Sequence, residues 1–217
     1  MSSALLLIDL QNDFLPGGAL AVPCGDEVIP VANSVQPRFD LIVATQDWHP
    51  PEHGSFAANH PGKQPFEQTH LFGLPQTLWP VHCVQGTPGA DFASGLDRTR
   101  WTAVFQKGTD PKVDSYSGLF DNGRRRATGL GDFLKARGVT NVYVMGLATD
   151  YCVKWTALDA ADLGLIVWLI TDGCRGVNLA PGDVDRAHSE MQARGVRLVH
   201  SRDVLLHLKS EIPIPKS

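Results

Sequence analysis

The sequence predicts an α/β protein whose parallel sheet is covered by helices on both faces. Three times in its second half, a helix-like segment that ends at a glycine is followed by a short apolar run, which is the order of βαβ units. Such units join parallel strands by right-handed crossovers. The runs are almost wholly apolar, as expected for strands that are buried on both faces.

Six apolar runs have the length and composition of strands. They cover residues 5–10, 41–45, 102–106, 142–145, 165–171 and 196–200. Helix-like segments are expected at residues 26–35, 131–137, 151–163 and 182/183–194. Each of the last three is followed by a glycine, the residue that most often terminates a helix.

Residues 47–100 interrupt this alternation. They are rich in proline, glycine, histidine and aromatic residues and show no sustained period. A structureless segment of this length inside a compact domain usually has a function. We therefore expect a metal- and substrate-binding loop region here, within a single domain that covers residues 1–217. Residues 212–217 are expected to fray.

Composition narrows the classes of function. The formal net charge of −4 gives no sign of nucleic-acid binding, and the absence of an apolar run of about 18 residues predicts no membrane span. The first residues lack the basic region of a signal peptide. The four cysteines are scattered without Cys-x-x-Cys spacing, which favours free thiols in the cytoplasm.

Cys152 lies where a predicted strand turns into a predicted helix. The first N–H groups of a helix point toward this position, and the positive end of the helix dipole favours an anion there. We therefore expect a thiol pKa lowered from about 8.5 toward neutrality, as in a nucleophile elbow with Cys in place of Ser. The alternative is an inert buried cysteine, because free cysteine is among the most buried residue types.

Reactive side chains end the first four predicted strands: Asp9, Asp47, Lys107 and Cys152. Ligands of open α/β sheets bind outside these carboxyl ends. A buried Asp9 needs a partner, and the Lys107 ammonium would serve both this carboxylate and a neighbouring thiolate. Taken singly, Asp9 could cap a turn and Lys107 could be solvated. With Cys152 they supply a nucleophile, a base and an electrostatic organiser.

A second group of residues has metal-binding spacing. Asp47 and His49 form an Asp-x-His pair at a strand end, and His82 would complete a set of two histidines and one carboxylate. Such sets suit Fe(II), Zn or Mn, and the residue types do not choose among them. His53 is a further candidate ligand. The alternative is a group of surface histidines in a polar loop.

Three aromatic residues follow strand ends and could wall a flat pocket: Phe14, Trp79 and Tyr116. Ordinary loop packing is the alternative interpretation for each of them. The sequence pattern leaves both open.

With these motifs in place, the chain resembles the nicotinamidase (pyrazinamidase) members of the isochorismatase-like cysteine hydrolase family, from residue 8 to about residue 199. The motifs that carry the resemblance are IDLQNDF at 8–14, DWH at 47–49, WPVHCVQGT at 79–87, KG at 107–108, YSG at 116–118 and GLATDYC at 146–152. The resemblance implies a three-layer α/β/α fold with a six-stranded, mainly parallel, Rossmann-like sheet in the order 3-2-1-4-5-6.

The same resemblance implies roles for individual residues. Asp9, Lys107 and Cys152 would form the catalytic triad. A cis peptide bond between Leu147 and Ala148 would turn backbone N–H groups inward, so that the amides of Ala148 and Cys152 form the oxyanion hole.

The metal and substrate residues follow in the same way. Asp47, His49 and His82 would hold one divalent metal ion. His53 follows His49 at a shorter spacing than the additional histidine ligand of some members, so coordination by His53, directly or through water, stays open. The residues expected to contact the substrate are Phe14, Trp79, Tyr116 and Leu147.

The implied reaction is hydrolysis of nicotinamide to nicotinate and ammonia through a cysteine thioester, as in NAD salvage, with pyrazinamide as a second substrate. The expected partner is this small molecule, not nucleic acid or a membrane, and the chain is a monomer or a homo-oligomer. The alternatives are a related N-carbamoyl amidohydrolase or an isochorismatase-type hydrolase, which would not need the metal residues, or a non-enzymatic binding protein.

Overall fold

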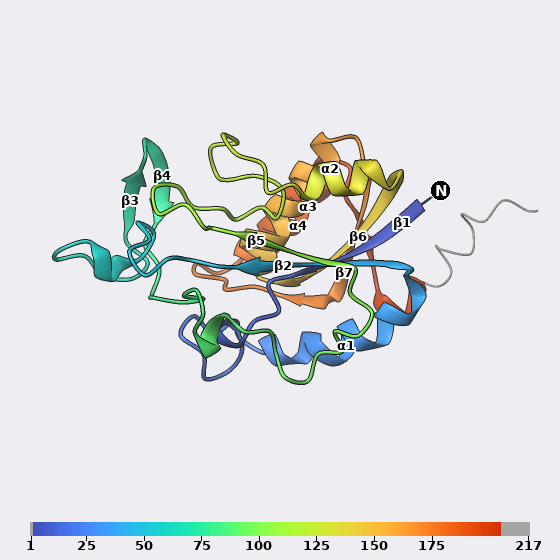
Figure 1. The fold of residues 1–217 in the computed structure, drawn as a ribbon, viewed down its shortest axis with the longest axis horizontal. Helices are drawn as coiled ribbons and strands as arrows, with labels where there is room; N and C mark the ends of the chain where they lie inside the picture. The colour runs from blue at the N-terminus through green and yellow to red at the C-terminus, as the bar shows by residue number, and fades with distance from the viewer. Residues whose placement is uncertain (1, 205–217) are drawn as a thin grey trace, which may run out of the picture.

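The structure, a computed structural model, describes residues 2–204 (Figure 1). Its main sheet has six strands in the order β5-β2-β1-β6-β7-β8, and every neighbouring pair is parallel. Numbered along the chain, these strands have the order 3-2-1-4-5-6, so the predicted topology is confirmed. The fraying expected at residues 212–217 lies outside the described residues.

All six predicted strands are present, with shifted ends. The strands are β1 (Ser2–Ile8), β2 (Leu41–Asp47), β5 (Ala103–Lys107), β6 (Val139–Leu147), β7 (Ile166–Arg175) and β8 (Arg197–Val199). The central strands β1 and β6 are almost wholly apolar because they are buried from both sides: Leu5 to Ile8 and Val142 to Met145 have no exposed surface.

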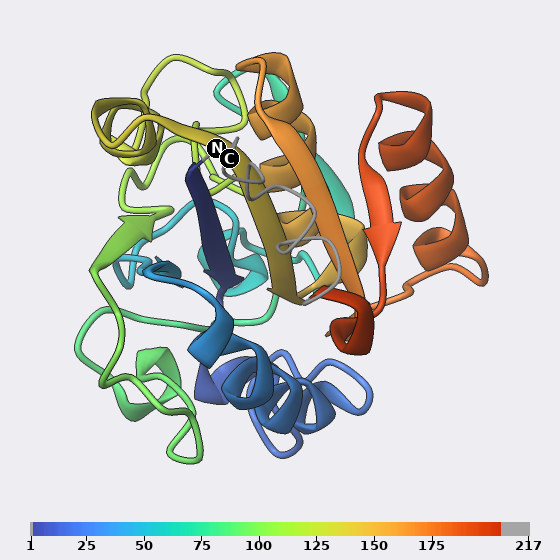
Figure 2. The ribbon, with the colours of Figure 1, turned by 90° about the vertical axis from the view of Figure 1, so that its right-hand side faces the viewer.

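The helices form the two outer layers. They are α1 (Val28–Val35), α2 (Leu130–Ala136), α3 (Lys154–Asp162) and α4 (Asp183–Ala193). Helix α1 covers one face of the sheet, and the other three cover the opposite face (Figures 1 and 2). This arrangement confirms the three-layer prediction. No helix among residues 2–204 is long and apolar enough to cross a membrane.

The start of the third predicted helix differs from the prediction. Residues Thr149–Val153 form a π-helical turn, and α3 proper begins only at Lys154. The amide of Val153 donates to the Ala148 carbonyl, five residues earlier, at 3.1 Å. Such turns are rare and are often found at functional sites.

Residues 47–100 contain more structure than expected. Strands β3 (Gln68–Leu71) and β4 (Leu74–Thr77) form an antiparallel hairpin at one end of the molecule (Figure 1). Phe72 and Gly73 connect them, and both have positive φ angles of 52° and 82°. Two such residues in succession fit the twist of a hairpin, and glycine adopts the conformation readily.

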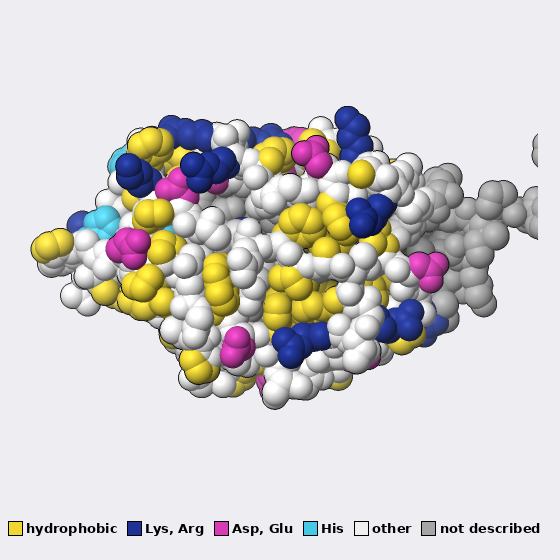
Figure 3. All heavy atoms as spheres, viewed as in Figure 1, with side chains coloured by type: hydrophobic (Ala, Val, Ile, Leu, Met, Phe, Trp, Pro, Cys, Tyr) yellow, Lys and Arg dark blue, Asp and Glu magenta, His cyan; other side chains and the backbone are white. Residues whose placement is uncertain are grey.

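The edge strand β5 lies on the face seen in Figure 3, where apolar side chains gather between scattered charges. Val104 of β5 is 43% exposed. Lys107, the last residue of the same strand, is buried. The reactive residues therefore lie at the buried carboxyl end of this strand, away from its exposed part.

Candidate active site

The carboxyl ends of four strands bring the predicted reactive residues together. Asp47 and Lys107 are the last residues of β2 and β5 and are register partners in the parallel pair. Asp9 follows β1, and Cys152 lies in the turn that follows β6. Asp9, Asp47 and Cys152 each place a side-chain oxygen or sulfur atom within 4.8 Å of the other two.

Lys107 is at the centre of this group. Its Nζ atom lies 2.9 Å from Asp9 Oδ2, 2.9 Å from Asp47 Oδ1 and 3.4 Å from Cys152 Sγ. It also donates to the Ser115 carbonyl at 2.9 Å. The contact with Asp47 was not predicted. A single ammonium therefore pairs with the carboxylate near the thiol and with the carboxylate among the histidines.

Ion pairing keeps Lys107 and Asp47 charged despite their burial. Burial alone would lower the pKa of Lys107, but Asp47 and Asp9 raise it well above its usual value. Burial alone would raise the pKa of Asp47, but His49 and Lys107 hold it well below its usual value. Both groups are therefore ionised at neutral pH.

The pKa values of Asp9 and Cys152 are shifted so that the uncharged forms are favoured. Burial raises the pKa of Asp9, although Lys107 opposes the shift. Burial also raises the pKa of the Cys152 thiol well above its usual value, again against the effect of Lys107. The lowered thiol pKa expected from the helix start is therefore wrong, because desolvation of the sulfur outweighs the neighbouring positive charge. The resting thiol is protonated and needs a base.

The peptide bond between Leu147 and Ala148 is cis, as the resemblance implied. Ala148 and Cys152 line the same pocket. The side chain of Leu147, however, is fully buried and does not line that pocket. The Leu147 side chain instead packs in the core beside Gly25. A Cβ added to Gly25 would lie 3.5 Å from Leu147 Cδ1.

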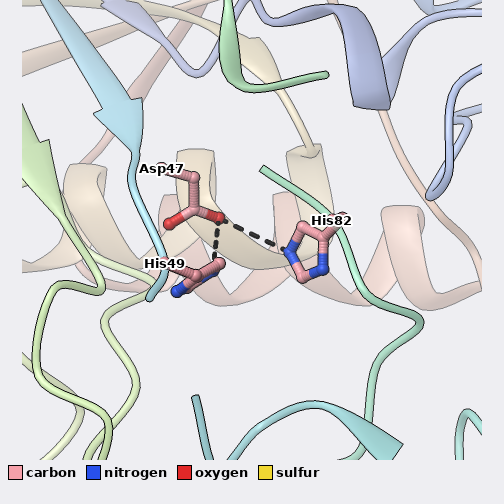
Figure 4. Close-up of side chains that lie close together, drawn as sticks. All are labelled: Asp47, His49 and His82. Atoms are coloured by element: carbon pink, nitrogen blue, oxygen red, sulfur yellow. Dashed lines mark ion pairs between the residues drawn. The ribbon is translucent and has the colours of Figure 1, made fainter. Parts of the chain in front are cut away.

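Asp47, His49 and His82 form the second half of the site (Figure 4). Asp47 Oδ2 lies 3.3 Å from His49 Nε2 and 3.7 Å from His82 Nε2. The Nδ1 atoms of the two rings lie 2.8 Å from backbone carbonyls, those of Gly108 and Pro80. Because Nδ1 donates to a carbonyl in each ring, Nε2 is the atom that faces Asp47, as in metal-ligating histidines. Against the effect of burial, Asp47 raises the pKa of His49. This buried donor set fits a divalent cation.

His53 is oriented differently. Its ring lies 4.3 Å from that of His49, and it forms an alternative group with His49 and Asp114. Its Nδ1 accepts from the Ser55 amide at 3.2 Å and lies 2.7 Å from the Ser55 hydroxyl. Burial lowers the pKa of His53 to about 4. Its buried Nε2 has no hydrogen-bond partner among the described residues.

The pocket beside Cys152 is small and partly aromatic. Its volume is about 30 Å³, and it is lined by Phe14, Leu20, Asp47, His49, Trp79, His82, Asp114, Tyr116, Ala148, Tyr151, Cys152 and Val177. The three predicted aromatic residues are all among them. The Trp79 indole N–H donates to the Tyr116 hydroxyl at 3.2 Å, so two of these aromatic walls are joined.

Two buried polar residues that hold the site were not predicted. The Thr45 hydroxyl donates to Asp9 Oδ1 at 2.6 Å. The Gln11 side chain accepts from the Asp47 amide at 2.7 Å and donates to the Asp47 carbonyl at 2.8 Å. Strand alternation would have indicated Thr45, because it lies on the same face of β2 as Asp47.

Comparison with known proteins identifies the family of this chain. The isochorismatase domain model matches residues 3–203. The nicotinamidase of Escherichia coli K12 is 55% identical over 199 residues, which are 90% of this chain and 93% of that protein.

Two solved structures are also similar. A nicotinamidase/pyrazinamidase from Acinetobacter baumanii is 46% identical with a TM-score of 0.91, over 94% of this chain and 98% of that one. The pyrazinamidase of Pyrococcus horikoshii in complex with zinc is 40% identical with a TM-score of 0.76, over 92% and 99% of the two chains. The chain therefore belongs to the isochorismatase family, within its nicotinamidase and pyrazinamidase group.

Proposed function

We propose that this protein is a nicotinamidase, which hydrolyses nicotinamide to nicotinate and ammonia through a thioester on Cys152. Pyrazinamide, a related ring carboxamide, is proposed as a second substrate, and NAD salvage as the use of the product. One observation carries the proposal: a partly aromatic pocket has a thiol with its base and lysine on one side and a metal-type donor set on the other.

The first half of the reaction forms the thioester. Asp9 takes the proton of the Cys152 thiol, a transfer favoured by the raised pKa of this carboxyl. Lys107, 3.4 Å from the sulfur, stabilises the thiolate as it attacks the carboxamide carbon. The amides of Ala148 and Cys152 are proposed to hold the oxyanion. Protonated Asp9 then gives its proton to the departing ammonia.

The second half releases the acid. Asp9, again a carboxylate, removes a proton from a water molecule that attacks the thioester carbon. The C–S bond breaks, the proton returns to the sulfur, and nicotinate leaves the pocket. Lys107 keeps its charge throughout, because it is paired with both Asp9 and Asp47.

We propose that Asp47, His49 and His82 hold one divalent metal ion, with Zn, Fe and Mn as candidates. When bound, the ion supplies a Lewis acid and a template for the ring nitrogen of the substrate. His53 is left out of this set, since it groups with His49 and Asp114 and not with Asp47 and His82. Trp79 and Tyr116, joined by their hydrogen bond, would orient the ring.

The test is ammonia release from nicotinamide by the wild type and by Cys152→Ala, with metal analysis of the purified protein. Turnover that Cys152→Ala abolishes and that a chelator suppresses is expected. Benzamide, which lacks the ring nitrogen, should be a poor substrate, and equal rates for the two amides would remove the template role. Turnover of an N-carbamoyl compound or of isochorismate in place of nicotinamide would contradict the proposal.

We also propose a cytoplasmic location. Cys24, Cys83, Cys152 and Cys174 are all free, and Cys24 is exposed. A nucleophilic thiol needs a reducing compartment to remain available. Fractionation of cells that express the protein, with nicotinamide hydrolysis as the readout, tests this. Whether the chain is a monomer or a homo-oligomer stays a prediction.

A further inference from the structure

A single buried hydroxyl joins the turn that carries the thiol to the loop that carries Tyr116. Thr156, in α3, has no exposed surface. Its Oγ1 donates to the Cys152 carbonyl at 2.7 Å and accepts from the Gly118 amide at 2.8 Å. We propose that Thr156 is a positioning residue, which holds Cys152 in register with the opposite wall of the pocket. This inference rests on the proposed role of Cys152 as nucleophile.

On one side, Thr156 acts where the helical register changes. Cys152 lies in the π-helical turn Thr149–Val153, and α3 starts at Lys154. Thr156 returns a side-chain hydrogen bond to the carbonyl four residues earlier, the usual local bond of a helical threonine. Here that carbonyl belongs to the residue whose sulfur must be aligned with Lys107.

On the other side, Thr156 fixes a loop that contributes to the pocket. The Ser115 carbonyl accepts from Lys107 Nζ at 2.9 Å, and Tyr116 lines the pocket. Gly118 ends this short segment close to its neighbours: a Cβ there would lie 2.6 Å from Thr45 Cγ2 and 3.5 Å from Thr156 Oγ1. The loop therefore approaches α3 closely enough for its amide to reach the hydroxyl.

The two bonds together set the spacing between the sulfur, the lysine and the aromatic wall. A misplacement of about 1 Å in a reacting group is enough to lower a rate about 100-fold. We therefore expect removal of the hydroxyl to lower kcat by about 10- to 100-fold, with a smaller change in KM. The sulfur should also react more slowly with an external electrophile, because it is no longer held beside Lys107.

The experiment compares Thr156→Val, which keeps the shape and removes the hydroxyl, with Thr156→Ser, which keeps the hydroxyl. Thr171→Val is the matched control, because the Thr171 hydroxyl donates to the Val199 carbonyl between β7 and β8. Each variant is assayed for kcat and KM with nicotinamide. Alkylation by iodoacetamide at pH 7 is measured site by site with mass spectrometry, and the exposed Cys24 serves as the internal reference for Cys152.

The proposal expects Thr156→Val to lose kcat and Cys152 labelling, Thr156→Ser to keep both within about threefold, and Thr171→Val to resemble the wild type. Wild-type kcat and labelling in Thr156→Val, or equal defects in Thr156→Val and Thr156→Ser, would overturn it. If Thr156→Val does not fold, Thr156→Ser and Thr156→Ala make the same comparison, and equal kcat in this pair overturns the proposal. A wild type inactive on nicotinamide would refute the proposed function, whereas the labelling ratio would still test the positioning.

Discussion

Replacing Lys107 by methionine removes the only charge that faces Asp9, Asp47 and Cys152 together among the described residues. Methionine has a similar length but no ammonium, so both buried carboxylates lose a partner at 2.9 Å. At an effective dielectric constant of about 20, each of these pairs is attractive by about 6 kcal/mol. Most of that attraction offsets the cost of burying the ions, and breaking such a pair destabilises a protein by about 3–5 kcal/mol.

We therefore expect Lys107→Met to lower the free energy of unfolding by about 3–5 kcal/mol at pH 7. The loss should be smaller at pH 5. Without the ammonium, burial raises the pKa of Asp9 further, so the folded state binds a proton more readily than the unfolded state. A group whose folded pKa is raised in this way makes the protein less stable as the pH rises through that pKa.

Urea unfolding followed by circular dichroism at pH 7 and pH 5 measures both effects, with and without a chelator. The double variant Asp9→Asn, Lys107→Met should recover part of the loss, because it leaves one fewer unpaired carboxylate, with a coupling energy of at least about 1 kcal/mol. An unfolding free energy of Lys107→Met within about 0.5 kcal/mol of the wild type would refute the reasoning.

The remaining predictions concern the metal residues and the core. Gly108→Ala should lose most of its bound metal, because a Cβ there would lie 2.4 Å from His49 Cε1. Gly138→Ala is the control and should keep its metal, because Gly138 has the same φ of 64° and open space around it. Equal metal contents of the two variants by elemental analysis would contradict this. Asp47→Asn should lower both metal content and ammonia release, since the neutral amide pairs weakly with a cation; full activity without metal would exclude the proposed ligand set. Leu6→Ala, fully buried in β1, should cost about 2–5 kcal/mol in urea unfolding and leave metal content unchanged.

The sheet and the residues at its carboxyl end could be predicted because they depend on local rules. Apolar runs bounded by glycine identify buried strands, and parallel strands must end at one edge. Asp9, Asp47, Lys107 and Cys152 therefore had to meet once the strand order was known. The hairpin β3–β4 was missed, because its strands have four residues each and one of them contains Pro75, a residue that argues against a strand.

Other features depend on distances that no local rule supplies. The ion pair of Lys107 with Asp47 requires the register of β2 against β5, and the bond from Thr45 to Asp9 requires the spacing of β1 and β2. The thiol pKa was predicted in the wrong direction, since the position at a helix start was visible in the sequence but the burial of the sulfur was not. The resemblance implied that the side chain of Leu147 contacts the substrate, and its burial in the core was not visible in the sequence.

Asp47 serves both halves of the site with different atoms, Oδ1 toward the lysine and Oδ2 toward the two imidazoles. A chelated apoenzyme would consequently differ from the holoenzyme by more than a missing Lewis acid. Without the cation, Lys107 would interact with a carboxylate whose negative charge is no longer shared with the metal, and the electric field at the sulfur would change. Rates compared across substituted metals will therefore report on nucleophile activation as well as on substrate orientation.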